Sequence, residues 1–364
     1  MAEDALPRRF LLQWHLTDSC NLSCRHCYDE AGQPKPELPL EQLVAFLRQY
    51  IRFLDANGIT GHINFTGGEP FLRDDLPELL REVRRHHETV SYAILSNGTM
   101  IDGPCARLLR RTGCRFVQIS VDGGPETHDA LRGPGTFNAC RRALGTLRRH
   151  GIPTMMSFTV SRVNWHDFPD VVRMACEEGA NVVWSDRLLP LGRGAEMTEN
   201  LLTAQEVDRF FETMFRSAEE LRNRQRCPTR VRMHRALQFR TLISRGVKNV
   251  IPYRCNAGRG LLSLMPDGRI LPCRRMPVTV GFFGRDSLEE VYREAPFLRT
   301  LRAEGRVAAG CEDCAWRASC GGGLRCLAYA RGGDPFRADP QCSLAREARE
   351  RGEAARSNRV FRRD

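Results

Sequence analysis

The stretch "TDSCNLSCRHCY", residues 17–28, governs the interpretation of the whole chain. It places Cys20, Cys24 and Cys27 within eight positions, and the next cysteine follows only at Cys105. An ordinary zinc site or a complete iron–sulfur cluster takes four thiolates. The stretch therefore raises two questions: what the three cysteines hold, and what completes the ligand set.

The sequence around this stretch alternates between short apolar runs and amphipathic segments up to about residue 190. Such alternation is typical of repeated βα units that build a parallel sheet. We count six units, too few for a closed eightfold barrel, so we expect an α/β fold with a partial, TIM-like (β/α)6 barrel. The predicted strands lie in "LLQWHLT" (11–17), "HINFTG" (62–67), "VSYAILSNG" (90–98), "RFVQISVDG" (115–123), "IPTMMSFTV" (152–160) and "ANVVWSDRLLP" (180–190).

The chain is expected to divide into a barrel and a smaller cysteine-rich α+β extension. Beyond the barrel, "LLSLMPDGRILPC" (261–273) predicts a hairpin with a Pro-Asp-Gly turn. The expected boundaries are an N-terminal segment 1–8, the barrel 9–200, a helical bridge 201–252, the extension 253–345 and a charged tail 346–364 that frays.

Composition favours a soluble, cytoplasmic protein that holds metal. The chain has 15 cysteines, no signal-peptide pattern and no apolar run long enough to span a membrane. Because the cytosol keeps thiols reduced, we do not expect a disulfide framework. Five cysteines outside the motifs are interpreted as small buried hydrophobic residues, with Cys227, in a predicted loop, the one to recheck; they are Cys105, Cys114, Cys140, Cys176 and Cys227.

The net charge of +11 does not by itself indicate a nucleic-acid-binding protein. The basic residues are arginines apart from Lys35 and Lys248, and they are scattered as pairs such as Arg84-Arg85. Scattered pairs are more typical of solvated helix faces than of a stripe that follows phosphates. An acidic peptide or another anionic partner is the better expectation.

The spacing CxxxCxxC on one loop suits a cubane iron–sulfur cluster. Each iron takes one thiolate, so Cys20, Cys24 and Cys27 can ligate three irons and leave the fourth open. Catalytic metal sites keep such an open position, whereas structural sites close it. The loop also follows the first predicted strand, at the edge where barrel folds place their chemistry.

At these cysteines the sequence resembles the radical S-adenosylmethionine (radical SAM) superfamily, with His26 at the position where the family commonly has an aromatic residue. The resemblance implies a 4Fe-4S cluster whose open iron binds S-adenosylmethionine, which is cleaved to a 5′-deoxyadenosyl radical that takes hydrogen from the substrate. The family's cofactor contacts would then lie at "GGEP" (Gly67, Gly68, Glu69, Pro70), at Ser96 and Asn97, at Ser120 and Asp122, and at Arg187 before "LLPLGRG". Taken singly, each of these segments is also an ordinary βα turn.

The C-terminal cysteines resemble the SPASM extension of radical SAM enzymes that modify peptides and proteins. The resemblance implies two auxiliary 4Fe-4S clusters, a distal one on Cys311, Cys314, Cys320 and Cys342, and a proximal one on Cys255, Cys273 and Cys326. "CGGGLRC" has a longer spacing than the family's, which puts Cys326 in doubt. With only three cysteines, the proximal cluster would have an open iron, a non-cysteine ligand or fewer irons. The alternative to the two clusters is a zinc ribbon built on Cys311 and Cys314.

We therefore expect an enzyme that oxidises a ribosomally made peptide or a protein by dehydrogenation or crosslinking. Expected partners are an electron donor such as flavodoxin or ferredoxin and, because the barrel begins near residue 9, a separate leader-binding protein. A small-molecule substrate such as an aminosugar or a tetrapyrrole side chain stays open, and a non-enzymatic cluster carrier ranks below both.

Formylglycine formation, as in sulfatase-maturing relatives, also ranks lower. Those enzymes have an aspartate base where this chain has Arg274 and Arg275. The twin arginines are expected to meet an acidic group or to face solvent. No catalytic residue is assigned.

Overall fold

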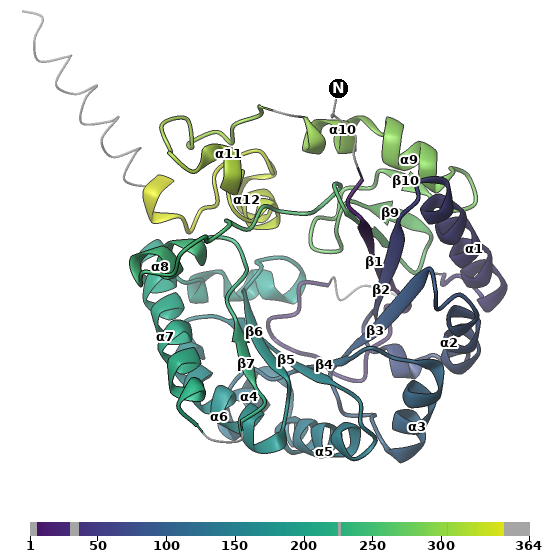
Figure 1. Ribbon diagram of the computed structural model, residues 1–364, viewed down its shortest axis with the longest axis horizontal. Helices are drawn as coiled ribbons and strands as arrows, with labels where there is room; N and C mark the ends of the chain where they lie inside the picture. Colours follow the sequence, from purple (N-terminus) through teal and green to yellow (C-terminus); the bar gives the residue numbers. More distant parts are fainter. Residues whose placement is uncertain (1–5, 30–35, 225–226, 304, 346–364) are drawn as a thin grey trace, which may run out of the picture.

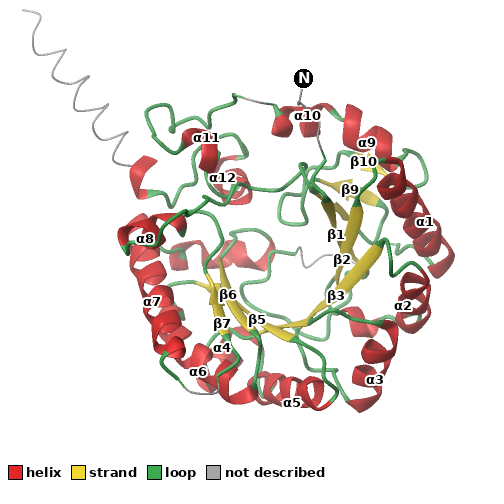
Figure 2. Cartoon of the chain, in the orientation of Figure 1, coloured by secondary structure: helices red, strands yellow, loops and turns green. Residues whose placement is uncertain are grey.

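The protein, described by a computed structural model, forms an arc of parallel strands with helices along its outer side (Figures 1 and 2). The structure describes residues 6–29, 36–224, 227–303 and 305–345. The expected charged tail, residues 346–364, lies outside them, as do residues 1–5. None of the described helices is long and apolar enough to cross a membrane.

Strands and helices alternate through the first two thirds of the described chain, as the sequence predicts. The parallel strands are β1 (Arg9–His15), β2 (Thr60–Thr66), β3 (Val90–Ser96), β4 (Val117–Ser120), β5 (Thr154–Val160), β6 (Val182–Arg187) and β7 (Arg230–Arg232). The helices between and after them are α1 (Leu40–Ala56), α2 (Leu76–Arg85), α3 (Gly103–Thr112), α4 (Pro125–Arg132), α5 (Thr136–Arg149), α6 (Phe168–Glu178) and α7 (Ala204–Arg222).

Shorter elements complete the described chain. Three 3-10 helices follow strand ends: η1 (Pro70–Leu72), η2 (Trp165–Asp167) and η3 (Gly192–Asn200). The C-terminal part contains α8 (Phe239–Ser244), β8 (Leu261–Leu264), β9 (Arg269–Leu271), β10 (Gly281–Phe282), α9 (Leu288–Glu294), α10 (Pro296–Arg302), α11 (Arg317–Cys320) and α12 (Arg325–Gly332).

The ten strands form one sheet in the order β10-β9-β8-β1-β2-β3-β4-β5-β6-β7. Neighbours from β8 to β7 run parallel, and no pairing joins the two outermost strands, β10 and β7. The sheet is therefore an open, partial barrel, which confirms the predicted fold class. The short strand β7 lies within residues 201–252, where the sequence predicts only helices.

Side chains of β1 alternate between the helical layer and the barrel interior. Phe10 and Trp14 are fully buried, and the Trp14 ring lies 5.1 Å from that of Phe46 on α1. Because successive strand residues point to opposite faces, Gln13 and His15 point to the interior. The core thus covers one face of the sheet and leaves polar side chains on the other.

The predicted hairpin is confirmed, but it joins the barrel sheet. At its turn the amide of Gly268 donates to the carbonyl of Met265 (3.0 Å), with φ of +84° at the glycine. Its first strand, β8, pairs in parallel with β1, Leu11 opposite Leu261. The cysteine-rich extension therefore begins as a continuation of the barrel wall.

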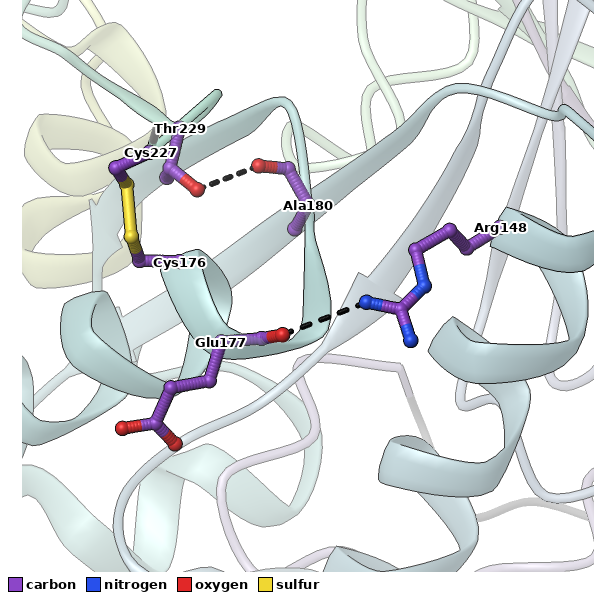
Figure 3. Close-up of a disulfide and its surroundings, with 6 residues drawn as sticks. All are labelled: Arg148, Cys176, Glu177, Ala180, Cys227 and Thr229. Atoms are coloured by element: carbon purple, nitrogen blue, oxygen red, sulfur yellow. Dashed lines mark hydrogen bonds between the residues drawn. A yellow bond between two sulfur atoms is a disulfide. The ribbon is translucent and has the colours of Figure 1, made fainter. Parts of the chain in front are cut away.

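Two cysteines interpreted as buried hydrophobic residues are paired instead. Cys176, at the end of α6, forms a disulfide with Cys227, which precedes β7 (Figure 3). The Thr229 hydroxyl also donates to the Ala180 carbonyl (2.6 Å), so the two segments lie side by side. The interpretation of Cys176 and Cys227 was wrong because their proximity depends on how the chain returns to the sheet across 51 positions.

A buried ion pair joins the barrel to the end of the extension. The Asp339 carboxylate accepts from both terminal nitrogens of Arg187 (2.9 and 2.5 Å), and both side chains are almost fully buried. Gln341 accepts from Arg187 as well (3.0 Å) and donates to the Leu202 carbonyl (2.7 Å). The barrel and the extension are therefore held at a fixed contact.

Removing one partner of this pair should destabilise the protein strongly. Asp339→Ala leaves the buried Arg187 guanidinium without its counter-charge, so we expect the free energy of unfolding to fall by about 3–5 kcal/mol. Urea denaturation monitored by circular dichroism measures it. Glu78→Ala, which breaks an exposed pair with Arg81, is the control and should change little; an equal loss in both variants would contradict the assignment.

Candidate functional site

A cavity of about 560 Å³ lies at the carboxyl ends of the parallel strands. Parallel barrels bind their ligands at this edge. Its walls come from the cysteine loop, from the turns after β2, β3 and β6, from the strands β4 and β5, and from the hairpin. Among the lining residues are Cys20, Cys24, Cys27, Gly67, Gly68, Ser96, Asn97, Ser120, Arg187 and Arg274.

The three loop cysteines all line this cavity. Burial raises the pKa of Cys20 and of Cys27, and the neighbouring Cys24 adds to both shifts. Thiols in such surroundings become ligands only when a cation compensates their charge. No three His, Cys, Asp or Glu side chains of the described chain converge enough to bind one metal ion. A cubane cluster does not require convergence on one ion, since each thiolate binds its own iron, so this donor set fits a cluster.

The glycine pair docks the cysteine loop onto the barrel. The amide of Gly68 donates to the Thr17 carbonyl (2.8 Å), and that of Glu69 donates to the Ser19 carbonyl (2.9 Å). A Cβ atom on Gly68 would lie only 2.1 Å from the Ser19 oxygen. The family resemblance places these glycines at the cofactor; in the structure the close approach of Gly68 is to the loop that carries the cysteines.

Glu69 is fully buried and fixes the neighbouring strand end. Its carboxylate accepts from the Ser96 hydroxyl (2.9 and 3.1 Å) and from the Asn97 amide (2.8 Å). Burial raises its pKa to about 7 despite these hydrogen bonds. Pro70 follows as the first residue of η1. Glu69 and Pro70 thus hold the turn in shape and do not themselves line the cavity.

Asp122 is likewise engaged by protein groups. It accepts from Arg132 Nε (2.5 Å) and from the Thr159 amide (2.6 Å), and it lies 2.9 Å from His26 Nε2. Burial alone would raise its pKa, but Arg132 and His26 hold it below its ordinary value. Arg132 also approaches the Cys24 sulfur (3.8 Å). Sequence reasoning missed Arg132, which links Asp122 to the cysteine loop.

The two remaining residues predicted to contact the cofactor differ in how strongly other protein groups already engage their side chains. Ser120 lines the cavity and receives only a long hydrogen bond from the Ser157 hydroxyl (3.3 Å). Arg187 also lines the cavity, but its guanidinium is occupied by Asp339 and Gln341. The extension therefore competes for the side chain that the sequence assigns to the cofactor.

The twin arginines face the cavity, which excludes the solvent-facing alternative. Arg274 donates to the Thr66 hydroxyl (2.6 Å), and Arg275 forms an ion pair with Asp186. His15 lies beside Thr66 in the strand register and is 1 % exposed. Neither ring nitrogen has a hydrogen-bond partner among the described residues, although Nε2 lies 3.6 Å from a carboxylate oxygen of Asp18. Sequence reasoning missed Asp186 and His15; their positions directly at strand ends were the available signal.

The C-terminal cysteines gather in two places. Cys311, Cys314, Cys320 and Cys342 line a small hollow of about 20 Å³. Burial and the three neighbouring thiols raise the pKa of Cys311 to about 12. Burial raises the pKa of Cys326 likewise to about 12, and Cys273 and Cys255 add to the shift. The grouping is the one that the sequence implies, and cluster binding there stays a prediction.

The other free cysteines fit the interpretation as packing residues. Cys140 is fully buried behind the turn of Asn97, whose carbonyl accepts from its thiol (3.3 Å). Cys105 and Cys114 are partly buried, and each thiol bonds a nearby carbonyl.

Comparisons with known proteins match both parts of the chain. Residues 14–175 match the radical SAM superfamily, and residues 255–315 match SPASM, an iron-sulfur cluster-binding domain. The chain is 30% identical to an AdoMet-dependent heme synthase of Nitratidesulfovibrio vulgaris (strain Hildenborough) over 94% of both chains. It is also 30% identical to the mycofactocin maturase MftC of Mycobacterium ulcerans, over 93% of this chain and 89% of that one.

A solved structure shows the same fold. The structure titled "Native anSMEcpe with bound AdoMet" superposes with a TM-score of 0.74 at 21% identity, covering 96% of this chain and 98% of that one. The match thus extends over the barrel and the extension.

Replacing Gly68 should displace the cysteine loop. The Cβ of Gly68→Ala would overlap the Ser19 carbonyl, so we expect about four fewer irons per chain after anaerobic reconstitution. Iron analysis measures the loss. Gly332→Ala, whose Cβ would meet nothing within 4 Å, is the control. Normal iron content in Gly68→Ala would show that the close contact does not position the loop.

Glu69 should make stability fall as the pH rises. Its pKa of about 7 in the folded chain exceeds the ordinary 4.5, so between these values only the unfolded chain ionises. Below pH 4.5 Glu69 makes its full contribution to the free energy of unfolding. As the pH rises to 7 this contribution falls by roughly 3 kcal/mol, at about 1.4 kcal/mol per pH unit. Urea denaturation across this range should show a flatter profile for Glu69→Gln; parallel profiles would contradict the raised pKa.

Proposed function

The chain belongs to the radical SAM superfamily and is an enzyme with a C-terminal SPASM domain, and from this premise we propose that it oxidatively modifies a ribosomally made peptide or a protein. The observation that supports this proposal is the convergence of Cys20, Cys24 and Cys27 with the turns after β2 and β3 on one cavity. A cluster carrier needs no such cavity.

We infer that the loop cysteines hold a 4Fe-4S cluster and that S-adenosylmethionine binds at its fourth iron. Together these groups would supply the 5′-deoxyadenosyl radical that takes hydrogen from the substrate. The turn of Gly67 and Gly68 would position the cofactor through its backbone. Ser96, Asn97 and Ser120 line the cavity with polar groups suited to its ribose and methionine.

Arg132 is better placed than Arg187 for the cofactor's carboxylate. Its terminal nitrogen lies beside the Cys24 sulfur (3.8 Å), and it lines the cavity. Arg187 is bound to Asp339 and Gln341. Asp122 would act indirectly by orienting Arg132 and His26.

A cluster held by the proximal cysteines would be suited to take up the electron that the substrate radical loses. Cys273 immediately precedes Arg274 and Arg275, which line the cavity. Cys311, Cys314, Cys320 and Cys342 would then carry a second cluster farther from the substrate. This arrangement supports a net two-electron oxidation, with a flavodoxin or ferredoxin as the external electron donor.

A peptide substrate draws support from the similarity to MftC, which is named a mycofactocin maturase. A tetrapyrrole is the second candidate, because the equally similar heme synthase matches 94% of both chains and the cavity wall is rich in arginine. Formylglycine formation lacks support, since Arg274 has the place of the aspartate base.

Anaerobic reconstitution with iron and sulfide tests the proposed chemistry. We expect about twelve irons per chain, four for each of three clusters, and 5′-deoxyadenosine from S-adenosylmethionine under reducing conditions. Cys24→Ala should keep about eight irons and form no 5′-deoxyadenosine.

Cys105→Ala, which removes a partly buried thiol on α3, is the matched control and should behave as wild type. Few irons, bound zinc and no cleavage in the wild-type protein would overturn the proposal. Consumption of Fe-coproporphyrin III instead of a precursor peptide would replace the peptide by the tetrapyrrole.

A further inference from the structure

Most arginines at the cavity are neutralised by a carboxylate. Their partners are Asp122 for Arg132, Asp186 for Arg275, Asp339 for Arg187, and Asp267 for Arg269. Asp186 is shared with Arg235, which does not line the cavity. Arg193 and Arg274 also line the cavity, yet neither forms an ion pair with any acid of the described chain. Neither guanidinium is therefore compensated by a carboxylate, although Arg193 lies close enough to the Cys27 thiol, and Arg274 to the Cys273 thiol, to oppose the rise in that thiol's pKa.

Arg274 is held in place without being neutralised. Its Nη1 donates to the Thr66 hydroxyl (2.6 Å), and its guanidinium carbon lies 5.4 Å from the centre of the Tyr28 ring. Its Nε is buried and has no hydrogen-bond partner among the described residues. The hydroxyl and the ring therefore orient a guanidinium that keeps unused donors.

Arg193 is placed by backbone packing next to the same tyrosine. A Cβ on Gly192 would lie 2.3 Å from the Asp29 carbonyl oxygen and 2.8 Å from the Tyr28 carbonyl carbon, and the Gly194 amide donates to the Cys27 carbonyl (2.8 Å). The Arg193 Nε is buried, and no hydrogen bond of this side chain is found in the described chain. The backbone before Arg193 thus packs against the backbone of residues 28 and 29, and the Arg274 guanidinium lies over the Tyr28 ring.

An uncompensated guanidinium in a partly buried cavity is costly unless an anion joins it. We propose that Arg193 and Arg274 form the subsite for a carboxylate of the substrate. The inference rests on the proposed function and adds the group by which the substrate is held. Guanidinium groups bind carboxylates through paired, charge-assisted hydrogen bonds, and the cofactor's own carboxylate has Arg132 beside Cys24.

Both candidate substrate classes carry such a group. A peptide offers its C-terminus or an acidic side chain, and a tetrapyrrole offers its propionates. In either case the carboxylate would be anchored beside Tyr28, between the cysteine loop and the hairpin that carries the proximal Cys273. The substrate would thus be held between the radical source and the electron acceptor.

Equilibrium dialysis against the anaerobically reconstituted protein with saturating S-adenosylmethionine tests the subsite. The probes are N-acetylglycine against N-acetylglycinamide, and coproporphyrin III against its tetramethyl ester. We expect at least one acid to bind about tenfold more tightly than its neutral counterpart, and which acid it is identifies the source of the carboxylate.

The variants identify the residues. Arg274→Gln should remove the preference for the acid, a loss of about tenfold, whereas Arg274→Lys should keep part of it because the charge remains. Arg193→Gln should act in the same direction. Iron content is measured for each variant. If Arg193→Gln loses iron because the segment around residue 193 contacts the loop of Cys27, only Arg274→Gln is used to test the subsite. Arg285→Gln removes an exposed charge from the turn after β10 and controls for the protein's general attraction for anions.

Three results would overturn the inference: no preference for either acid, a preference that survives Arg274→Gln, or acid binding that S-adenosylmethionine abolishes. The last result would assign the two arginines to the cofactor. Formation of 5′-deoxyadenosine by the wild-type protein is measured in parallel. If 5′-deoxyadenosine forms, any of the three results contradicts only the carboxylate subsite. If it does not form, the proposed function is contradicted as well.

Discussion

Two backbone hydrogen bonds, from Gly68 and Glu69 to the carbonyls of Thr17 and Ser19, are the contact on which the candidate site depends. They join the loop after β1 to the turn after β2, and they form only because position 68 has no side chain. Since β1 and β2 are parallel and in register, both loops leave the sheet at the same edge. The cysteines are thereby presented to the cavity.

Three buried carboxylates hold further segments of the barrel and the extension in place. Glu69 holds the end of β3 through Ser96 and Asn97, Asp122 holds Arg132 and His26 near the cysteines, and Asp339 ties β6 to the extension. Asp122 and Asp339 compensate the charge of an arginine as well as fixing a loop, whereas Glu69 is held by neutral donors. The cavity retains positive charge where this compensation stops, at Arg193 and Arg274.

The extension is continuous with the barrel. Its first strand, β8, pairs with β1, so Arg274 and Arg275 reach the cavity from the hairpin's far end. The proximal cysteines consequently lie near the site where substrate oxidation would occur. Electron transfer out of the substrate and recognition of the substrate would then share one structural element.

The sequence by itself determined the partial barrel, the hairpin turn and most elements, though not the short strand β7, because periodicity and turn residues are local patterns. Its cysteine motifs also indicated the enzyme family, through their resemblance to radical SAM and SPASM sequences. Only the tertiary structure decided which side chains are available to bind a ligand in the cavity. Arg187 and Asp122 are occupied by partners far away in sequence, and Cys176 meets Cys227 across 51 positions. The inward orientation of Arg274 and Arg275 likewise depends on where the hairpin joins the sheet. Such contacts have no fixed spacing along the chain, since they arise from packing between distant segments.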